Sequence, residues 1–374
     1  MSSGKYVKWD EPKVEHGAGP EEDALIHEIE QQINTCQNAV WAESRHAYSG
    51  THVKSHAFLK GEFEILSGLP TELAQGMFAK PGKHNAAMRF STETTAMIDD
   101  RVRQPRGIGL KVFEVEGEKL RNDGVDPKTQ DFEFNSCPVL ELANARTCRD
   151  IIALRLKHGG CPADLDGALK KRDDYEVQDG RNHIPAVNLL GQRQYGQAAF
   201  RWGDYVAKYA LIPSPSQVSD KELSDKDSGH AFSEQLRNHF AKNGAEWDFQ
   251  VQLLERSFFE KEPECVEDAR INWPQKEYPF VTVAKLRIPA QESMMPARRV
   301  FWEDRLRLNP WDGLKVHLPL GSINRVRKGV YRASAVHRRK LNATFAVDCT
   351  SIDDIPDEKP IDEELKKAGV PIMA

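Results

Sequence analysis

Short segments with strand character, separated by turn residues, recur along most of the chain and restrict its fold more than any other feature. The first is the run THVKSHAFLKGEFEIL from Thr51, in which Gly61 predicts a bulge or bend. Further strands are expected at 86–91, 107–115, 130–135, 194–212, 246–257 and 279–287. Strands at this spacing, joined by irregular loops, predict an antiparallel β-barrel.

Helices are expected between and around these strands, where apolar residues recur at helical spacing. They are expected at 21–45, 141–157, 230–243 and 322–342, and the charged segment 161–184 is expected to be partly helical on the surface. The polar residues 1–20 are interpreted as an extended or mobile N-terminal arm, and the acidic residues 351–374 as a C-terminal tail. Residues 21–350 are therefore predicted to form one α+β domain, a barrel with surrounding helices.

The composition excludes several classes of protein. Of the 374 residues, 39% are hydrophobic and 29% charged, as in a soluble globular protein, and the net charge of -5 argues against nucleic-acid binding. No apolar run approaches the roughly 20 residues that span a membrane, and the N-terminus lacks the apolar region of a secretory signal. The six cysteines are scattered without a CxxC pair, which predicts reduced thiols in a cytoplasmic protein.

The predicted helix 322–342 carries the first candidate for chemistry. Helical spacing places five polar residues along one face: Asn324, Arg327, Tyr331, Ser334 and Arg338. A solvated surface is the plain interpretation of such a face. The alternative is that Arg327, one turn from Tyr331, lowers the pKa of the phenol and holds it as a phenolate. A tyrosine phenolate is a known axial ligand of haem iron.

Three upstream segments complete a pattern with this helix. They are GTHVK at 50–54, RFS at 89–91 followed by QPRGIGLKV at 104–112, and DFEFNSCPV at 131–139. In this order, and followed by an RxxxY motif that ends at Tyr331, the chain resembles the haem catalase superfamily. It is most similar to short catalase-related, peroxidase-like members that lack a C-terminal extra domain. The resemblance runs from about residue 45 to residue 342 and implies a catalase-like barrel around haem b.

The resemblance implies catalytic roles for three residues on the peroxide side of the haem. His52 matches the distal histidine, and an imidazole held on a strand can take a proton from peroxide and return it. Ser91 matches the serine that orients this histidine by a hydrogen bond. Asn135 matches the distal asparagine, which can donate a hydrogen bond to the bound peroxide.

Four further residues match the groups that bind the haem itself. Tyr331 matches the ligand of the iron, and Arg327 matches the arginine that keeps this tyrosine ionised. Arg89 and Arg338 match two arginines that bind haem propionates, for which the bidentate guanidinium is well suited.

The chain departs from the family pattern near these residues. The family usually has an arginine three residues before the distal histidine, where this chain has Ser49, and Arg45 is the nearest alternative. Leu140 replaces a distal aromatic residue, which opens or reshapes the pocket. The segment 332–334, Arg-Ala-Ser, replaces an Asp-Thr pair.

The resemblance implies a haem-dependent oxidoreductase of the catalase or peroxidase type, acting on hydrogen peroxide or organic hydroperoxides. An organic electron donor and assembly into a homo-oligomer are further expectations from the family. One alternative is a haem enzyme that rearranges or cleaves fatty-acid hydroperoxides, as allene oxide synthases and hydroperoxide lyases do. Another is a non-catalytic barrel that binds haem or a lipid.

Other residues have plainer interpretations. Gly107 and Gly109 lack the further residues of a phosphate-binding loop, so they predict close backbone approach or a bend within the barrel. His56 is expected to be a solvated or hydrogen-bonded core histidine, and Lys54 is as compatible with the surface as with a pocket.

Overall fold

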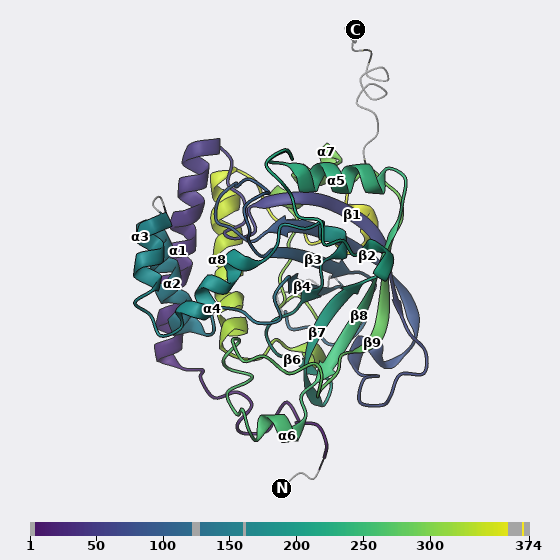
Figure 1. The fold of residues 1–374 in the computed structure, drawn as a ribbon. Helices are drawn as coiled ribbons and strands as arrows, with labels where there is room; N and C mark the ends of the chain where they lie inside the picture. The colour runs from purple at the N-terminus through teal and green to yellow at the C-terminus, as the bar shows by residue number, and fades with distance from the viewer. Residues whose placement is uncertain (1–3, 122–127, 160–161, 358–368, 370–374) are drawn as a thin grey trace.

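The computed structural model describes residues 4–121, 128–159, 162–357 and 369. In these residues an antiparallel β-sheet closes into a barrel, and helices cover its outside (Figure 1). The predicted α+β class and barrel are therefore confirmed. In the same part of the chain, no helix is both long enough and apolar enough to cross a membrane.

Eight strands of the described chain form the ring in the order β5-β4-β3-β2-β1-β9-β8-β7, and pairing of β5 with β7 closes it. A further strand, β6, forms a hairpin with β7. The strands are β1 Lys54–Ile65, β2 Gly82–Thr92, β3 Arg106–Val112, β4 Gln130–Asn135, β5 Gln194–Tyr195, β6 Phe200–Trp202, β7 Tyr205–Pro213, β8 Ala245–Leu253 and β9 Val281–Ile288.

Aromatic side chains fill the inside of the barrel. Phe132 of β4 and Phe249 of β8 are buried, with ring centroids 4.9 Å apart, although their strands are not neighbours. Phe63 of β1 meets Phe249 at 5.3 Å. Because these side chains meet across the interior of the barrel, they form a packed core there. A ligand must therefore bind elsewhere in the molecule.

The helices form a layer against one side of the barrel and shorter covers elsewhere. The two longest, α1 and α8, lie side by side, and α2 packs on α1 (Figure 1). The helices are α1 Pro20–Ser44, α2 Ala145–His158, α3 Pro162–Leu169, α4 Tyr175–Gly180, α5 Ala231–Phe240, α6 Arg256–Phe259, α7 Pro296–Asp304 and α8 Ser322–Leu341. The four helices expected from periodicity are present within a few residues of their predicted bounds.

The structure corrects three details of the predicted elements. The segment 194–212 is divided among β5, β6 and β7, because Gly203, with φ of 62°, turns the chain into a hairpin. The bulge expected at Gly61 lies between Ser55 and Ala57, and Gly61 is instead where the carbonyl of Arg287 on β9 approaches too closely for a side chain. The short helices α6 and α7 were not predicted.

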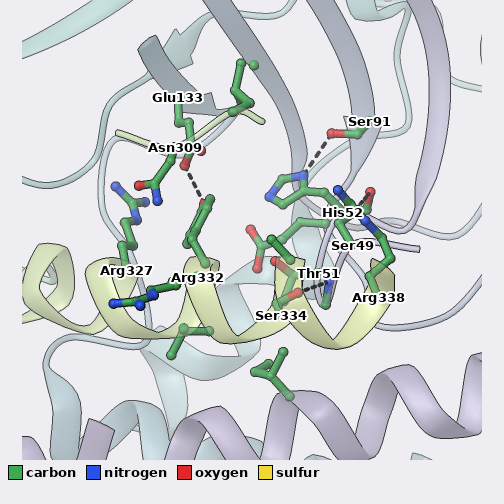
Figure 2. Close-up of a pocket in the computed structure, with 18 of the residues that line it drawn as sticks. Ser49, Thr51, His52, Ser91, Glu133, Asn309, Arg327, Arg332, Ser334 and Arg338 are labelled. Atoms are coloured by element: carbon green, nitrogen blue, oxygen red, sulfur yellow. Dashed lines mark hydrogen bonds between the residues drawn. The ribbon is translucent and has the colours of Figure 1, made fainter. Parts of the chain in front are cut away.

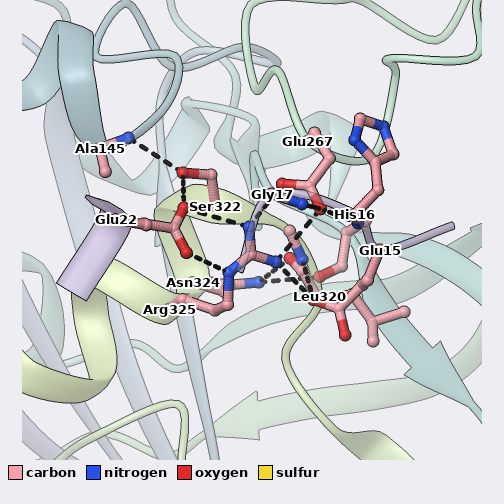
Figure 3. Close-up of polar contacts among 12 residues, drawn as sticks. Glu15, His16, Gly17, Glu22, Ala145, Glu267, Leu320, Ser322, Asn324 and Arg325 are labelled. Carbon is pink, nitrogen blue, oxygen red and sulfur yellow. Dashed lines mark hydrogen bonds and ion pairs between the residues drawn. The ribbon is translucent and has the colours of Figure 1, made fainter. Parts of the chain in front are cut away.

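An ion-pair cluster attaches the N-terminal arm to the start of α8 (Figure 3). Arg325 lies 2.8 Å from Glu15 of the arm, 2.5 Å from Glu22 of α1 and 2.7 Å from Glu267. The backbone amide of His16 also donates to Glu267, at 2.9 Å. These contacts fix residues 15 and 16 of the arm against the helix layer.

The beginning of the predicted tail also packs on the domain. Ile355 is fully buried, and its carbonyl accepts a hydrogen bond from Lys60 at 2.6 Å. The remainder of the tail beyond residue 357, apart from Gly369, lies outside the described residues.

Candidate active site

Three neighbouring strands present one row of site residues to the helix layer. Ser91 on β2 pairs with Gly107 on β3, which pairs with Asn135 on β4. Two residues away on each strand, Arg89 pairs with Gly109, which pairs with Glu133. Directly opposite residues of an antiparallel sheet share a face, and so do residues two apart on a strand. Strand β3 thus has glycine at both positions, 107 and 109, between the polar side chains of β2 and β4.

The two glycines leave a hollow that other side chains occupy. A Cβ atom at Gly107 would lie 2.4 Å from Cε1 of His52, and one at Gly109 would lie 2.6 Å from Cδ2 of Leu308. No side chain fits at those distances, so glycine is required for the imidazole to lie against β3. The expectation of close approach at Gly107 and Gly109 is confirmed, and Gly107 is part of the histidine site.

His52 lies in the loop before β1, so the expectation that a strand holds it is wrong. Its backbone is left-handed, with φ of 56°, an uncommon conformation outside glycine. Hydrogen bonds to its carbonyl come from Ser49 Oγ, at 3.2 Å, and from Arg89. The predicted partner Ser91 places Oγ 3.0 Å from His52 Nδ1 (Figure 2). Polar contacts on both backbone and ring therefore set the orientation of the imidazole.

The electrostatic surroundings keep His52 neutral. Burial, with smaller contributions from Arg89 and Arg327, lowers the pKa of His52 to about 3. The Ser91 hydroxyl can donate to the carbonyl of Gly107, at 3.4 Å, while it accepts from His52 Nδ1. In that arrangement Nε2 is the unprotonated nitrogen and can act as a base.

Asn135 ends β4 and lies beside a carboxylate that the sequence analysis did not single out. Its Nδ2 donates a hydrogen bond to Glu93 Oε2, and both side chains are buried. The carbonyl oxygen of Asn135, Oδ1, is buried without a hydrogen-bond partner in the described part of the protein. Asn135 is therefore held from one end only.

Tyr331 faces the row of strand residues from α8, and its hydroxyl donates a hydrogen bond to Glu133. Burial, followed by the charge of Glu133, raises the pKa of Tyr331 well above its usual value, and Arg327 opposes this only partly. Burial also raises the pKa of Glu133, to about 7. Burial and Glu133 thus oppose the ionisation of Tyr331 that Arg327 favours.

Arg327 itself contacts the helix as well as the site. Its Nη1 donates to Asn324 Oδ1 at 3.1 Å, one turn earlier on α8. The structure therefore places the predicted cation near Tyr331 but without a direct hydrogen bond to it among the described contacts.

The two arginines expected to bind carboxylates differ in their surroundings. Arg89 is held by Ser55 Oγ, at 3.0 Å, and by the carbonyl of His52. Arg338 is buried, and its Nε has no hydrogen-bond partner among the described residues. Burial, followed by the charges of Arg339 and Arg89, lowers the pKa of Arg338 to about 10. A buried cation with unused donors suits an anionic group bound in the cavity.

All seven predicted site residues line one cavity of about 450 Å³ between α8, the barrel and the adjoining helices. An apolar part is formed by one packed cluster: Ile29, Ile33, Leu140, Leu142, Cys148, Ile152, Ile323, Val326 and Val330. A charged part is formed by Arg89, Glu303, Arg338 and Arg339, whose charges act on one another. The cavity is thus amphipathic and within the size range of cofactor sites.

The structure shows where the residues that differ from the family pattern lie relative to the cavity. Leu140 is buried in the apolar part of the cavity, and Ser49 lines the cavity beside His52. Arg45 instead stacks on Trp41, with its guanidinium 5.4 Å from the ring centroid, and does not line the cavity. Ser334 Oγ accepts a hydrogen bond at 3.0 Å from the amide of Gly50, which fixes the loop that carries His52 (Figure 2).

Three carboxylates that line the cavity, Glu93, Glu133 and Glu303, were missed from the sequence. Strand periodicity could have found Glu133, because it lies two residues from Asn135 and therefore on the same face of β4. Glu93 directly follows β2, where periodicity no longer applies. Among the described residues, no group of three or more His, Cys, Asp or Glu side chains is arranged to hold a metal ion. The tyrosine oxygen of Tyr331 is the candidate ligand atom.

Lys54 and His56 belong to a separate buried cluster. Lys54 Nζ lies 2.7 Å from Asp100 Oδ1, and His56 Nε2 lies 2.7 Å from Thr92 Oγ1. Both side chains have satisfied partners in the core, so the structural interpretation of His56 is confirmed and a surface position for Lys54 is excluded.

Comparisons with known proteins support the fold. No protein-family model matches the chain. The catalase of Rattus norvegicus is 22% identical over 292 residues, which cover 72% of this chain and 52% of the rat protein. The chain therefore spans about half the length of this curated relative.

Solved structures of catalases have the same fold. A fungal catalase matches with a TM-score of 0.61 at 15% identity, over 87% of this chain and 71% of the other. Catalase A from Saccharomyces cerevisiae matches with a TM-score of 0.57 at 15% identity, over 84% of this chain and 66% of the other. A bacterial catalase matches with a TM-score of 0.54 at 17% identity, over 91% of this chain and 66% of the other.

The barrel with its helix layer is the catalase fold. At these identities the likeness is one of fold, and this chain is catalase-like in its fold.

Proposed function

We propose that this protein binds haem in the amphipathic cavity and acts on hydrogen peroxide or an organic hydroperoxide as an oxidoreductase. The observation that carries the proposal is the placement of the His52–Ser91 pair and Asn135 opposite Tyr331 across one cavity. The catalase-like fold and the peroxide-related names of the similar proteins support the same chemistry.

The residues present fit a haem group. Its apolar edge would lie in the cluster around Leu140, and its carboxylates would pair with Arg338, whose Nε is otherwise unpartnered, and with Arg89. Tyr331 would supply the ligand oxygen, which requires its hydroxyl to leave Glu133 and lose its proton. Bound haem would supply the redox chemistry that cleaves the O–O bond.

The protein's own contribution to the reaction is to place and move a proton. His52, neutral at physiological pH, accepts the proton of the hydroperoxide at Nε2 and returns it to the departing oxygen. Ser91 and the left-handed loop hold the imidazole in the orientation that this transfer requires. Asn135 fixes the position of the peroxide beside His52. The apolar wall around Leu140 excludes water from the reacting oxygen atoms.

The test is turnover of hydrogen peroxide and of an alkyl hydroperoxide by the purified, haem-supplied protein and its His52→Ala variant. We expect the wild type to consume peroxide and the variant to bind haem equally while losing at least about 100-fold in turnover, as expected for loss of a general base. Equal turnover by the variant would exclude the proposed mechanism.

A further inference from the structure

Glu93 is a buried carboxylate that the proposed reaction does not yet use. It lies directly after β2 and lines the same cavity as His52 and Asn135. One of its oxygens, Oε2, accepts the hydrogen bond from Asn135 Nδ2. The residue that would fix the peroxide is therefore itself held by Glu93.

This contact determines which way the amide of Asn135 points. The charges of Arg181 and Arg155 favour the ionised form of Glu93, which offers acceptors alone, so the NH₂ end of the amide faces it. The flipped amide would bring its carbonyl oxygen against an oxygen of that carboxylate, two acceptors without a hydrogen between them. The orientation of Asn135 in the structure is the one that an ionised Glu93 requires.

Glu93 is in turn fixed by a chain of ion pairs on the side away from the cavity. Arg181 Nη2 lies 3.8 Å from Glu93 Oε1 and donates to the Glu93 carbonyl at 3.2 Å. Arg181 and Arg155 both contact Glu141 Oε1, each at 2.9 Å. Burial and Glu141 raise the pKa of Glu93, whereas the two arginines oppose this. The carboxyl group therefore has a defined place and defined neighbours.

With its amino end on Glu93, Asn135 has one unsatisfied group left, the buried oxygen Oδ1. Since the described residues supply no donor to Oδ1, a molecule in the cavity is the remaining source of one. His52 Nε2 is the second acceptor of the site, because Nδ1 is engaged by Ser91. The pair of acceptors is complementary to a ligand that donates hydrogen bonds.

We propose that Glu93 is a positioning residue that turns Asn135 to offer its carbonyl oxygen, a hydrogen-bond acceptor, to the O–H group of a hydroperoxide. The proposal rests on the proposed function. It reverses the donor role expected of Asn135 from the family resemblance. Hydrogen peroxide, with an O–H at each end, can satisfy both acceptors, whereas an alkyl hydroperoxide can satisfy one.

The test compares Glu93→Gln and Glu93→Leu in the haem-supplied protein, using two readouts. The first is the pair of side-chain amide NMR signals of Asn135, assigned by their loss in Asn135→Ala. The second is peroxide turnover. Glutamine keeps an acceptor oxygen for Asn135, so we expect its amide signals to stay near their wild-type positions and turnover to fall by no more than a few-fold. Leucine removes the acceptor, so we expect the signals to shift upfield and turnover to fall about 100-fold, as for a misplaced site group.

A double-mutant cycle separates positioning from general damage. If Glu93 acts through Asn135, Glu93→Leu has no further effect on turnover in an Asn135→Ala background. Additive losses, or unchanged amide signals in Glu93→Leu, would overturn the proposal. Failure of the wild type to turn over any peroxide would instead overturn the proposed function, and the amide signals would still decide whether Glu93 orients Asn135.

Discussion

Tyr331 on α8 donates a hydrogen bond to Glu133 on β4, and this contact joins the helix layer to the barrel across the cavity. It places a carboxylate against the phenol that the RxxxY motif marks as an iron ligand. The nearby Arg327 favours the phenolate, but burial and Glu133 act in the opposite direction and dominate. In the proposed function, Glu133 therefore opposes the loss of the Tyr331 proton that iron ligation requires.

Replacing Glu133 by Gln should therefore strengthen haem binding. The substitution keeps the size of the side chain but removes the charge that raises the pKa of Tyr331. Because a lower pKa makes the phenolate ligand easier to form, we expect haem affinity to rise at neutral pH. Haem titration followed by absorbance measures this. Glu141→Gln, another buried carboxylate that does not line the cavity, serves as the control, and equal affinities for Glu133→Gln and wild type would contradict the prediction.

His52 should make the cofactor-free protein sensitive to acid. Its pKa is lowered from the usual 6.5 to about 3 in the folded protein, so the unfolded chain binds the proton more tightly. The stabilising contribution is complete above pH 6.5 and is lost as the pH falls toward 3. Between pH 7 and pH 5, we expect the wild type to lose about 2 kcal/mol more unfolding free energy than His52→Gln. Urea unfolding at the two pH values measures the difference, and parallel losses would refute it.

Gly107→Ala should disable the histidine site without touching a polar group. The added Cβ would lie 2.4 Å from His52 Cε1, so the imidazole must move away from Ser91. We expect turnover to fall nearly as far as in His52→Ala, with haem retained. Gly82→Ala on β2 is the matched control, because the nearest atom to its Cβ is 4.0 Å away. If Gly107→Ala turns over peroxide as fast as Gly82→Ala, the space beside Gly107 is not needed to place the His52 imidazole.

Two arginines of α8, the half-buried Arg325 and the buried Arg338, should respond oppositely to replacement by Met. Arg325 pairs with three carboxylates, so Arg325→Met leaves unpaired buried charge and should cost about 3–5 kcal/mol of stability. Arg338 has an unpartnered Nε, so Arg338→Met should be neutral or stabilising without cofactor, but should weaken haem binding. Denaturant unfolding and haem titration of both variants test this. A large stability loss in Arg338→Met would contradict the assignment of Arg338 to a bound anion.

The barrel and the long helices could be predicted because their sequences repeat at the periods of strands and helices. The hairpin at Gly203 and the short helix α7 could not, since neither is long enough to show a period. The loop conformation of His52 was missed for a related reason. The carbonyl of this left-handed residue accepts hydrogen bonds from Ser49 of the same loop and from Arg89 of β2, and its ring contacts Ser91, also of β2.

The seven candidate residues of the site could be found in the sequence through motif order, and the structure brings all of them to one cavity. Their protonation and orientation could not be predicted in the same way. Glu93 and Glu133 contact Asn135 and Tyr331 only in the folded chain, since they lie 42 and 198 residues from them in sequence. Long-range partners of this kind leave no periodic signal.

The central claim, that the cavity binds haem through Tyr331, is tested most directly by absorption titration of the purified protein with haem, beside Tyr331→Phe. We predict that the wild type binds one haem and gives the spectrum of tyrosinate-ligated ferric haem, and that Tyr331→Phe loses that spectrum. Failure of the wild type to bind haem, or an identical spectrum from Tyr331→Phe, would contradict the claim.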